Sequence, residues 1–107
     1  MSSKKSAIKE KSNNTEFEIV FPSSGRGLKE IEILLQRRKK QLEKAIEKLR
    51  YFPSDFKIKG IEKIDNASLG QYTIRVSKGD RIFYDVDVKN KRVLILRAGK
   101  HDLYRLI

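Results

Sequence analysis

The chain has 107 residues, of which 38% are hydrophobic and 36% are charged, as expected of one globular domain with a compact core. Cysteine is absent, which excludes disulfide frameworks and thiolate metal sites, and no apolar run approaches the roughly 20 residues of a membrane span. The N-terminus lacks the apolar stretch of a signal peptide, so we expect a cytoplasmic protein. Lys and Arg number 25 against 14 Asp and Glu, and the formal net charge of +11 favours a polyanionic partner. Charge alone does not distinguish nucleic acid, the ribosome and an acidic protein.

The first predicted elements are a tail and a strand. Residues 1–14 are rich in Ser, Lys and Asn, and we expect a disordered basic tail there, followed by a single domain over residues 15–107. Phe17, Ile19 and Phe21 alternate with polar residues, which is the pattern of a half-buried strand. A proline follows directly and ends this strand, because proline cannot donate to a β-ladder.

A helical pattern follows, from about Leu28 to Phe52. Its apolar residues form two stripes with helical spacing, the first made of Leu28, Ile31, Leu34 and Leu35 and the second of Leu42, Ala45, Ile46 and Leu49. Residues 36–41 between the stripes include no apolar side chain. We therefore predict two helices, or one bent helix, folded as a hairpin against a sheet. Pro53 ends the second helix, because a residue before proline avoids the helical region.

The remainder of the chain has the period of β-strands. Apolar and polar residues alternate in two strands, residues 72–76 and 81–88, which a turn at residues 77–80 joins. A second turn at residues 89–91 leads to a third strand, residues 93–98. Upstream, residues 56–64 form either a strand or an extended connection. Successive strands joined by tight turns indicate an antiparallel meander. We therefore predict an α+β fold, with an N-terminal strand, a two-helix hairpin and an antiparallel β-meander, the helices packed on one face of the sheet.

Several segments resemble the RelE/ParE toxin superfamily. The run Y-T-I-R-V-S-K-G-D-R-I-F-Y-D-V-D, residues 72–87, is similar to the central hairpin of that family. The hydrophobic strand Arg92–Gly99 follows, and Lys100–Tyr104 is similar to the family's C-terminal motif. Upstream, Leu42–Leu49 resembles its second helix, which also ends near a proline. The resemblance covers residues 42–107 by motif and the preceding part of the domain by element order alone.

This resemblance implies a toxin of a type II toxin–antitoxin system that cleaves mRNA in the ribosomal A site, with no metal or other cofactor. In that reaction the ribose 2′-hydroxyl attacks the adjacent phosphate, leaving a cyclic phosphate and a free 5′-hydroxyl. The chemistry needs a group that takes the 2′ proton, cations that stabilise the phosphorane, and a group that protonates the leaving oxygen. The resemblance also implies an acidic antitoxin partner and a toxin–antitoxin heterotetramer.

Two arginines match catalytic positions of RelE-type enzymes. Arg81 opens the strand after the hairpin turn, where the family holds a phosphate-stabilising cation, and a guanidinium fork suits phosphate oxygens. The alternative for Arg81 is a surface ion pair with Asp80 or Asp85. Arg75 matches a basic residue of the family's groove and is predicted to lie on the solvent face of its strand. Two residues earlier, where the family often has a second basic residue, this chain has Thr73.

Two further catalytic candidates lie near the C-terminus. His101 falls where the family places a functional His or Arg, and it titrates near neutral pH, so it is assigned as base or acid. Tyr104 matches the tyrosine that stacks on the substrate or helps to activate the 2′-hydroxyl. The alternatives are a surface histidine and a tyrosine that packs the C-terminus onto the sheet.

Other basic residues are candidates for RNA binding. Lys78 lies in the hairpin turn, Arg97 on the last strand and Lys100 beside His101. A second set, expected to form a separate basic surface between the helices, consists of Arg37, Arg38, Lys39 and Lys40. For all of them the alternative is a solvated charge that keeps the protein soluble.

Two rival functions are open. The first is a ParE-type toxin, which shares the fold but inhibits DNA gyrase, and the second is a non-catalytic basic module that binds nucleic acid or the ribosome. Arg75, Arg81, His101 and Tyr104 together favour the RelE type over the ParE type. Thr73 keeps the non-catalytic module open, because it lowers the charge of the groove.

Overall fold

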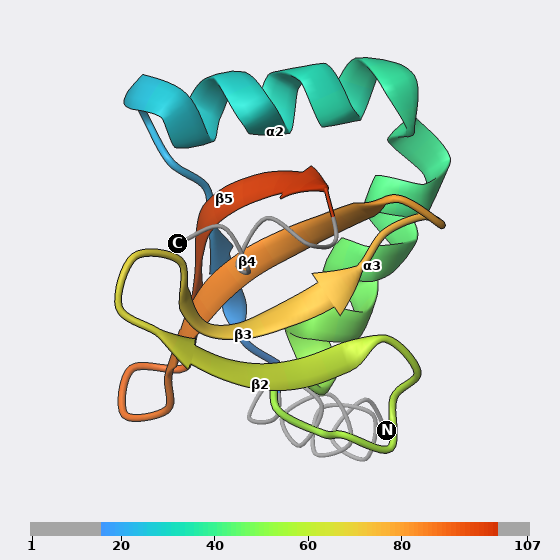
Figure 1. The fold of residues 1–107 in the computed structure, drawn as a ribbon. Helices are drawn as coiled ribbons and strands as arrows, with labels where there is room; N and C mark the ends of the chain where they lie inside the picture. The colour runs from blue at the N-terminus through green and yellow to red at the C-terminus, as the bar shows by residue number, and fades with distance from the viewer. Residues whose placement is uncertain (1–15, 101–107) are drawn as a thin grey trace, which may run out of the picture.

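The computed structural model describes residues 16–100, so the predictions for residues 1–14, His101 and Tyr104 lie outside the described residues. In chain order its elements are β1 (Glu18–Val20), α2 (Gly25–Arg37), α3 (Lys39–Tyr51), β2 (Ile61–Asn66), β3 (Gly70–Arg75), β4 (Asp80–Asp87) and β5 (Arg92–Lys100). They form the α+β architecture expected, with the helices between the first strand and the meander (Figure 1). Within the described range, no helix is long and apolar enough to cross a membrane.

The sheet has the strand order β1-β5-β4-β3-β2. Strands β2 to β5 are the antiparallel meander that the sequence predicts. The uncertain segment 56–64 does contain a strand, but β2 begins only at Ile61. The meander therefore has four strands. Strand β1 pairs in parallel with β5, with Ile19 beside Val93. This parallel pairing was not predicted, and it requires the long crossover that the two helices supply.

The two helices are confirmed, and they meet at Arg38, whose φ of −138° and ψ of 48° interrupt the helical backbone. They form an open hairpin, in which α2 runs beside β5 and α3 lies behind the sheet (Figure 1). At Gly27 the helix comes so close to β5 that an added Cβ would lie 2.3 Å from the carbonyl oxygen of Leu96. A side chain here would push α2 off the sheet.

One hydrophobic core joins the helices to the rear face of the sheet. Its buried members come from both layers. The helices contribute Ile31, Leu34, Leu42, Ala45, Ile46 and Leu49. The sheet and the turn between β3 and β4 contribute Ile61, Ile74, Val76, Ile82, Tyr84, Val93, Ile95 and Ala98. The hydroxyl of Tyr84 donates a 2.6 Å hydrogen bond to the carbonyl of Pro53, and burial raises the pKa of that hydroxyl. This bond ties the loop after α3 to the central strand, so the buried phenol is satisfied.

Candidate functional site

The candidate catalytic arginines lie side by side on the face of the sheet that points away from the core. Arg75 on β3 and Arg81 on β4 are directly opposite each other in the strand register. Their neighbours Ile74 and Ile82 are buried in the core, and successive side chains of a strand point to opposite faces. Arg75 is exposed, as predicted, whereas Arg81 is only 4% exposed. The hairpin turn thus brings the two guanidinium groups onto one face.

The carboxylate of Glu62 completes this cluster. Glu62 lies opposite Thr73 in the pairing of β2 with β3, so it shares the face of the two arginines. Its Oε2 atom lies 3.4 Å from Nη2 of Arg81, and the Glu62 side chain is 53% exposed. The acid beside Arg81 is therefore Glu62 and not Asp80 or Asp85. We call Glu62, Arg75 and Arg81 the arginine site.

Arg81 has donors that the described part of the chain does not satisfy. Its Nε and Nη1 atoms are buried and have no hydrogen-bond partner there. A buried, incompletely paired cation costs on the order of several kcal/mol, so this arrangement is expensive for stability alone. Phosphate oxygens match the planar guanidinium and would satisfy these donors. The arginine site therefore has the chemistry of an anion site.

Thr73 does not replace the second basic residue of the family. Its side chain is fully buried, and its hydroxyl donates a 2.9 Å hydrogen bond to the carbonyl of Ile82. This position is thus occupied by a neutral, satisfied group. Thr73 therefore adds no charge to the arginine site, whose positive charge comes from Arg75 and Arg81.

Asp80 joins the helix bend to the turn between β3 and β4. This buried carboxylate accepts a 2.6 Å hydrogen bond from the Ser77 hydroxyl and lies 3.9 Å from Nη1 of Arg37 and 3.5 Å from Nε of Arg38. Burial by itself would raise the pKa of Asp80, but Ser77, the two arginines and Lys100 outweigh it and hold the pKa below its ordinary value. Arg37 and Arg38, predicted as part of a separate basic surface on the helices, therefore lie beside the carboxylate of the hairpin turn.

The lysines of the predicted RNA-binding set are solvent-exposed around this junction. Lys78 is in the turn itself, and Lys100 on β5 is opposite Asp80 in the register. Lys39 and Lys40 form the first turn of α3, directly after the bend. The bend, the hairpin turn and the end of β5 thus each carry exposed lysines.

Arg97 is placed differently from this set. Its guanidinium makes two hydrogen bonds to the carboxylate of Glu30 on α2, at 2.7 and 2.9 Å, and the backbone N–H of Ala98 donates to the same carboxylate at 3.1 Å. Burial by itself would raise the pKa of Glu30, but these bonds and the nearby positive charge hold it below its ordinary value. Arg97 therefore fastens α2 to β5, and it is not free to contact phosphate in this arrangement.

Sequence reasoning missed Glu62. Its strand lies in the segment whose pattern was ambiguous, and nothing local connects it to an arginine 19 residues later in the chain. A correct prediction of β2 paired with β3 would have placed its carboxylate on the arginine face. Among residues 16–100, no group of three or more His, Asp or Glu side chains is arranged to hold a metal ion.

No protein-family model matches this sequence, and no curated protein matches it at a significant level. The fold, however, is similar to several solved toxin structures. YoeB in its dimer from Staphylococcus aureus is 24% identical, with a TM-score of 0.56 over 80% of this chain and 98% of that one. YafQ in the E. coli DinJ–YafQ toxin–antitoxin complex is 16% identical, with a TM-score of 0.59 over 80% and 93%. The Mycobacterium tuberculosis RelBE2 toxin–antitoxin complex matches at 16% identity and a TM-score of 0.51 over 80% and 99%. This chain therefore has the RelE-like α+β toxin fold.

Proposed function

We propose that this chain, which has the RelE-like toxin fold, is the toxin of a type II toxin–antitoxin system and cleaves mRNA on the ribosome. The observation that carries the proposal is the buried guanidinium of Arg81, which has two unpartnered nitrogens and lies beside a second arginine and a carboxylate. Such a group is costly unless an anion binds to it. The fold shared with toxins of known toxin–antitoxin complexes supports the same conclusion.

In the proposed reaction the scissile phosphate binds to Arg81 and Arg75. The Glu62 carboxylate takes the proton of the ribose 2′-hydroxyl, whose oxygen then forms a bond to phosphorus. The two guanidinium groups stabilise the negative charge of the phosphorane. The bond from phosphorus to the 5′ oxygen breaks, and that oxygen receives a proton, in our assignment from His101. The products are a 2′,3′-cyclic phosphate and a 5′-hydroxyl, and no oxidant or metal takes part.

The surrounding basic surface would hold the substrate. Arg38, Lys78 and Lys100 lie at the junction of helix bend, hairpin turn and β5, next to the arginine site. Positive groups so placed attract RNA backbone, and the affinity falls as salt is raised, because bound counterions are released. The assigned protein partner is an acidic antitoxin, and the expected assembly is a heterotetramer, as described for the YoeB–YefM complex of Staphylococcus aureus.

The test is to express the chain from a tightly regulated promoter and to map mRNA 5′ ends after induction. We expect codon-phased cuts that disappear in Arg81→Ala and persist in Arg92→Ala. Arg92 is the matched control, because its side chain is 52% exposed and it lies at the start of β5, where it forms an ion pair with Glu18. Circular dichroism of both variants checks that they are folded.

The alternative outcomes are distinct. Growth arrest with intact mRNA and damaged DNA would replace this proposal with gyrase inhibition. Neither arrest nor cleavage would indicate a non-catalytic module that binds RNA or the ribosome. Cuts that persist in Arg81→Ala would remove Arg81 from the reaction and leave the arginine site without a catalytic role.

A further inference from the structure

The bend between α2 and α3 concentrates positive charge. Helix α2 ends at Arg37, Arg38 interrupts the helical backbone, and Lys39 and Lys40 begin α3, whose first turn contains no acidic residue. The N-terminus of a helix is the positive end of its dipole, so cations there are unfavourable. Neighbouring cations also repel one another. The bend therefore needs a carboxylate from elsewhere in the chain.

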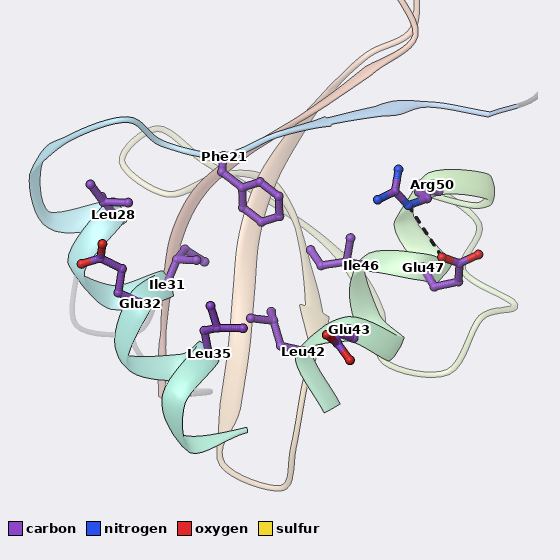
Figure 2. A pocket seen from close by; sticks show the side chains of 10 residues that line it. All are labelled: Phe21, Leu28, Ile31, Glu32, Leu35, Leu42, Glu43, Ile46, Glu47 and Arg50. Atoms are coloured by element: carbon purple, nitrogen blue, oxygen red, sulfur yellow. Dashed lines mark ion pairs between the residues drawn. The ribbon is translucent and has the colours of Figure 1, made fainter. Parts of the chain in front are cut away.

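Three carboxylates of the helices lie at a different place. Between α2 and α3 there is an apolar groove of about 470 Å³, which we call the helix groove (Figure 2). Its apolar lining consists of Phe21, Leu28, Ile31, Leu35, Leu42 and Ile46, and its charged lining of Glu32, Glu43, Glu47 and Arg50. Among residues 16–100, no ion pair joins these glutamates to Arg37 or Arg38. The glutamates of the helix groove thus leave the charge of the bend to another partner.

Asp80 supplies the carboxylate from the turn between β3 and β4. Its Oδ1 atom lies 3.9 Å from Nη1 of Arg37, and its Oδ2 atom lies 3.5 Å from Nε of Arg38. Lys100 is opposite Asp80 in the register of β4 with β5. The Asp80 side chain is only 7% exposed, so salt and water screen these attractions less than at the surface. One buried carboxylate thus holds the cationic bend against the turn.

The same residue also fixes the turn. The backbone carbonyl of Asp80 accepts hydrogen bonds from the N–H groups of Val76 and Ser77, at 2.8 and 3.2 Å. Its carboxylate accepts a 2.6 Å hydrogen bond from the Ser77 hydroxyl. This turn joins Arg75, the last residue of β3, to Arg81 near the start of β4. The two guanidinium groups repel each other, so their spacing depends on how firmly the turn is held.

We propose that Asp80 is a positioning residue of the arginine site, because its carboxylate joins the turn to the helix bend and so holds Arg75 and Arg81 in the arrangement that binds one phosphate. This inference rests on the proposed function. Preorganised donors bind an anion more tightly, since no ordering of the turn opposes binding. The sign of the effect is diagnostic. A negative charge near the site by itself opposes phosphate binding, whereas a positioning carboxylate strengthens it.

The experiment measures the binding of inorganic phosphate to the full chain by NMR, through the Nε–Hε signal of Arg81. The variants are Asp80→Asn, which removes the charge and keeps the shape, and Asp87→Asn as the matched control. Asp87 lies at the other end of β4, where its carboxylate accepts hydrogen bonds from Asn90 at 2.8 and 3.2 Å. We expect Asp80→Asn to weaken phosphate binding by at least about fivefold, with Asp87→Asn within about twofold of the wild type.

A double-mutant cycle tests whether Asp80 acts through the bend. Arg37→Gln and Arg38→Gln are combined in one bend variant, which is measured in the wild-type and in the Asp80→Asn background. The positive charge that the bend variant loses is the same in both backgrounds and cancels in the cycle. We expect the loss of phosphate affinity to be about threefold larger in the wild-type background. Equal losses in the two backgrounds would contradict a contact that acts through the bend.

The phosphate titration itself can overturn the proposal. Unchanged affinity in a folded Asp80→Asn chain would limit Asp80 to folding stability, and tighter binding would show that only its charge acts. Equal losses in Asp80→Asn and Asp87→Asn would remove any particular role of the first turn. No shift of the Arg81 signal in the wild type would overturn the anion site and this inference together.

A second variant covers the case in which urea unfolding shows that Asp80→Asn does not fold. Ser77→Ala removes one hydrogen bond from the Asp80 carboxylate and leaves every charge in place. It should weaken phosphate binding by about twofold, and unchanged affinity would overturn the proposal. Phosphate binding requires neither ribosome nor cleavage, so a failure of the proposed function in the mRNA experiment is distinguishable from a failure here.

Discussion

The arginine site and the helix groove are built on opposite sides of one core. In the sheet, neighbouring residues point to opposite faces: Ile74 and Ile82 pack into the core, whereas Arg75 and Arg81 lie on the other face. On α2 a single broad apolar stripe serves two purposes, because Ile31 is buried in the core and also lines the groove that Leu35 leaves open. The arginine site has two buried nitrogens of Arg81 without a partner among residues 16–100, whereas the groove is lined by apolar side chains, three glutamates and Arg50.

The net charge of +11 is thus not spread evenly over the molecule. Positive groups lie where the hairpin turn meets the helix bend, because Asp80 forms ion pairs with Arg37 and Arg38. Three glutamates, Glu32, Glu43 and Glu47, line the groove between α2 and α3 together with Arg50. The predictions below test whether the two regions act independently.

The largest effect is expected at the arginine site. Glu62→Gln should lower the rate of mRNA cleavage by about a hundredfold, because glutamine cannot take the 2′ proton. The measurement is single-turnover cleavage on programmed ribosomes, with Glu18→Gln, a 67% exposed carboxylate on β1, as the control. Undiminished cleavage in Glu62→Gln would mean that Glu62 only balances the charge of Arg81.

A mutation in the shared core should destabilise the whole domain, including both regions. Leu49 is fully buried on α3 between helix and sheet, and Leu49→Ala should cost about 3 kcal/mol of unfolding free energy through the lost contacts and the cavity. Cleavage by Leu49→Ala should then be lost at a lower urea concentration than cleavage by the wild type. Leu35→Ala, at an exposed position of the groove, should cost less than about 1 kcal/mol. A small loss in Leu49→Ala would contradict a single continuous core.

A smaller effect is expected where Glu30 fastens α2 to β5. Glu30→Gln removes the carboxylate that accepts two hydrogen bonds from Arg97 and one from the Ala98 N–H. Because the bonds from Arg97 are charge-assisted, we expect the free energy of unfolding to fall by about 2 kcal/mol. Urea unfolding at pH 7 gives the value. Glu32→Gln is the control, because Glu32 is an exposed residue of the same helix, and its substitution should change stability by less than about 0.5 kcal/mol.

The pH dependence of folding stability provides a second test of the pair formed by Glu30 and Arg97. The pKa of Glu30 is lower in the folded chain than its ordinary value of 4.5, so its carboxylate stabilises the fold above that value. This contribution is lost as the pH falls from the ordinary pKa through the lowered one, because the folded state then has to take up a proton. Wild type should therefore lose stability on acidification below about pH 4.5 more steeply than Glu30→Gln. Parallel curves would show that Arg97 does not depend on the charge of Glu30.

Much of the fold was predictable because its signals are local. The two helical stripes, the break between them, and the alternation around the turn before Arg81 each follow from a few neighbouring residues. The same alternation predicts that Arg75 points away from Ile74 and toward solvent, as it does. The functional identity of Arg81 came from motif resemblance, since an arginine at a strand start has no chemical signature of its own.

Tertiary structure decided what depends on pairing between distant segments. The parallel contact of β1 with β5, the placement of Glu62 beside Arg81, and the capture of Arg37 and Arg38 by Asp80 each join parts of the chain that no local pattern connects. The groove likewise depends on how the two helices meet at Arg38, because its lining comes from both helices and from Phe21. Periodicity determines which side of an element is apolar; the strand register and the helix bend decide what each side meets.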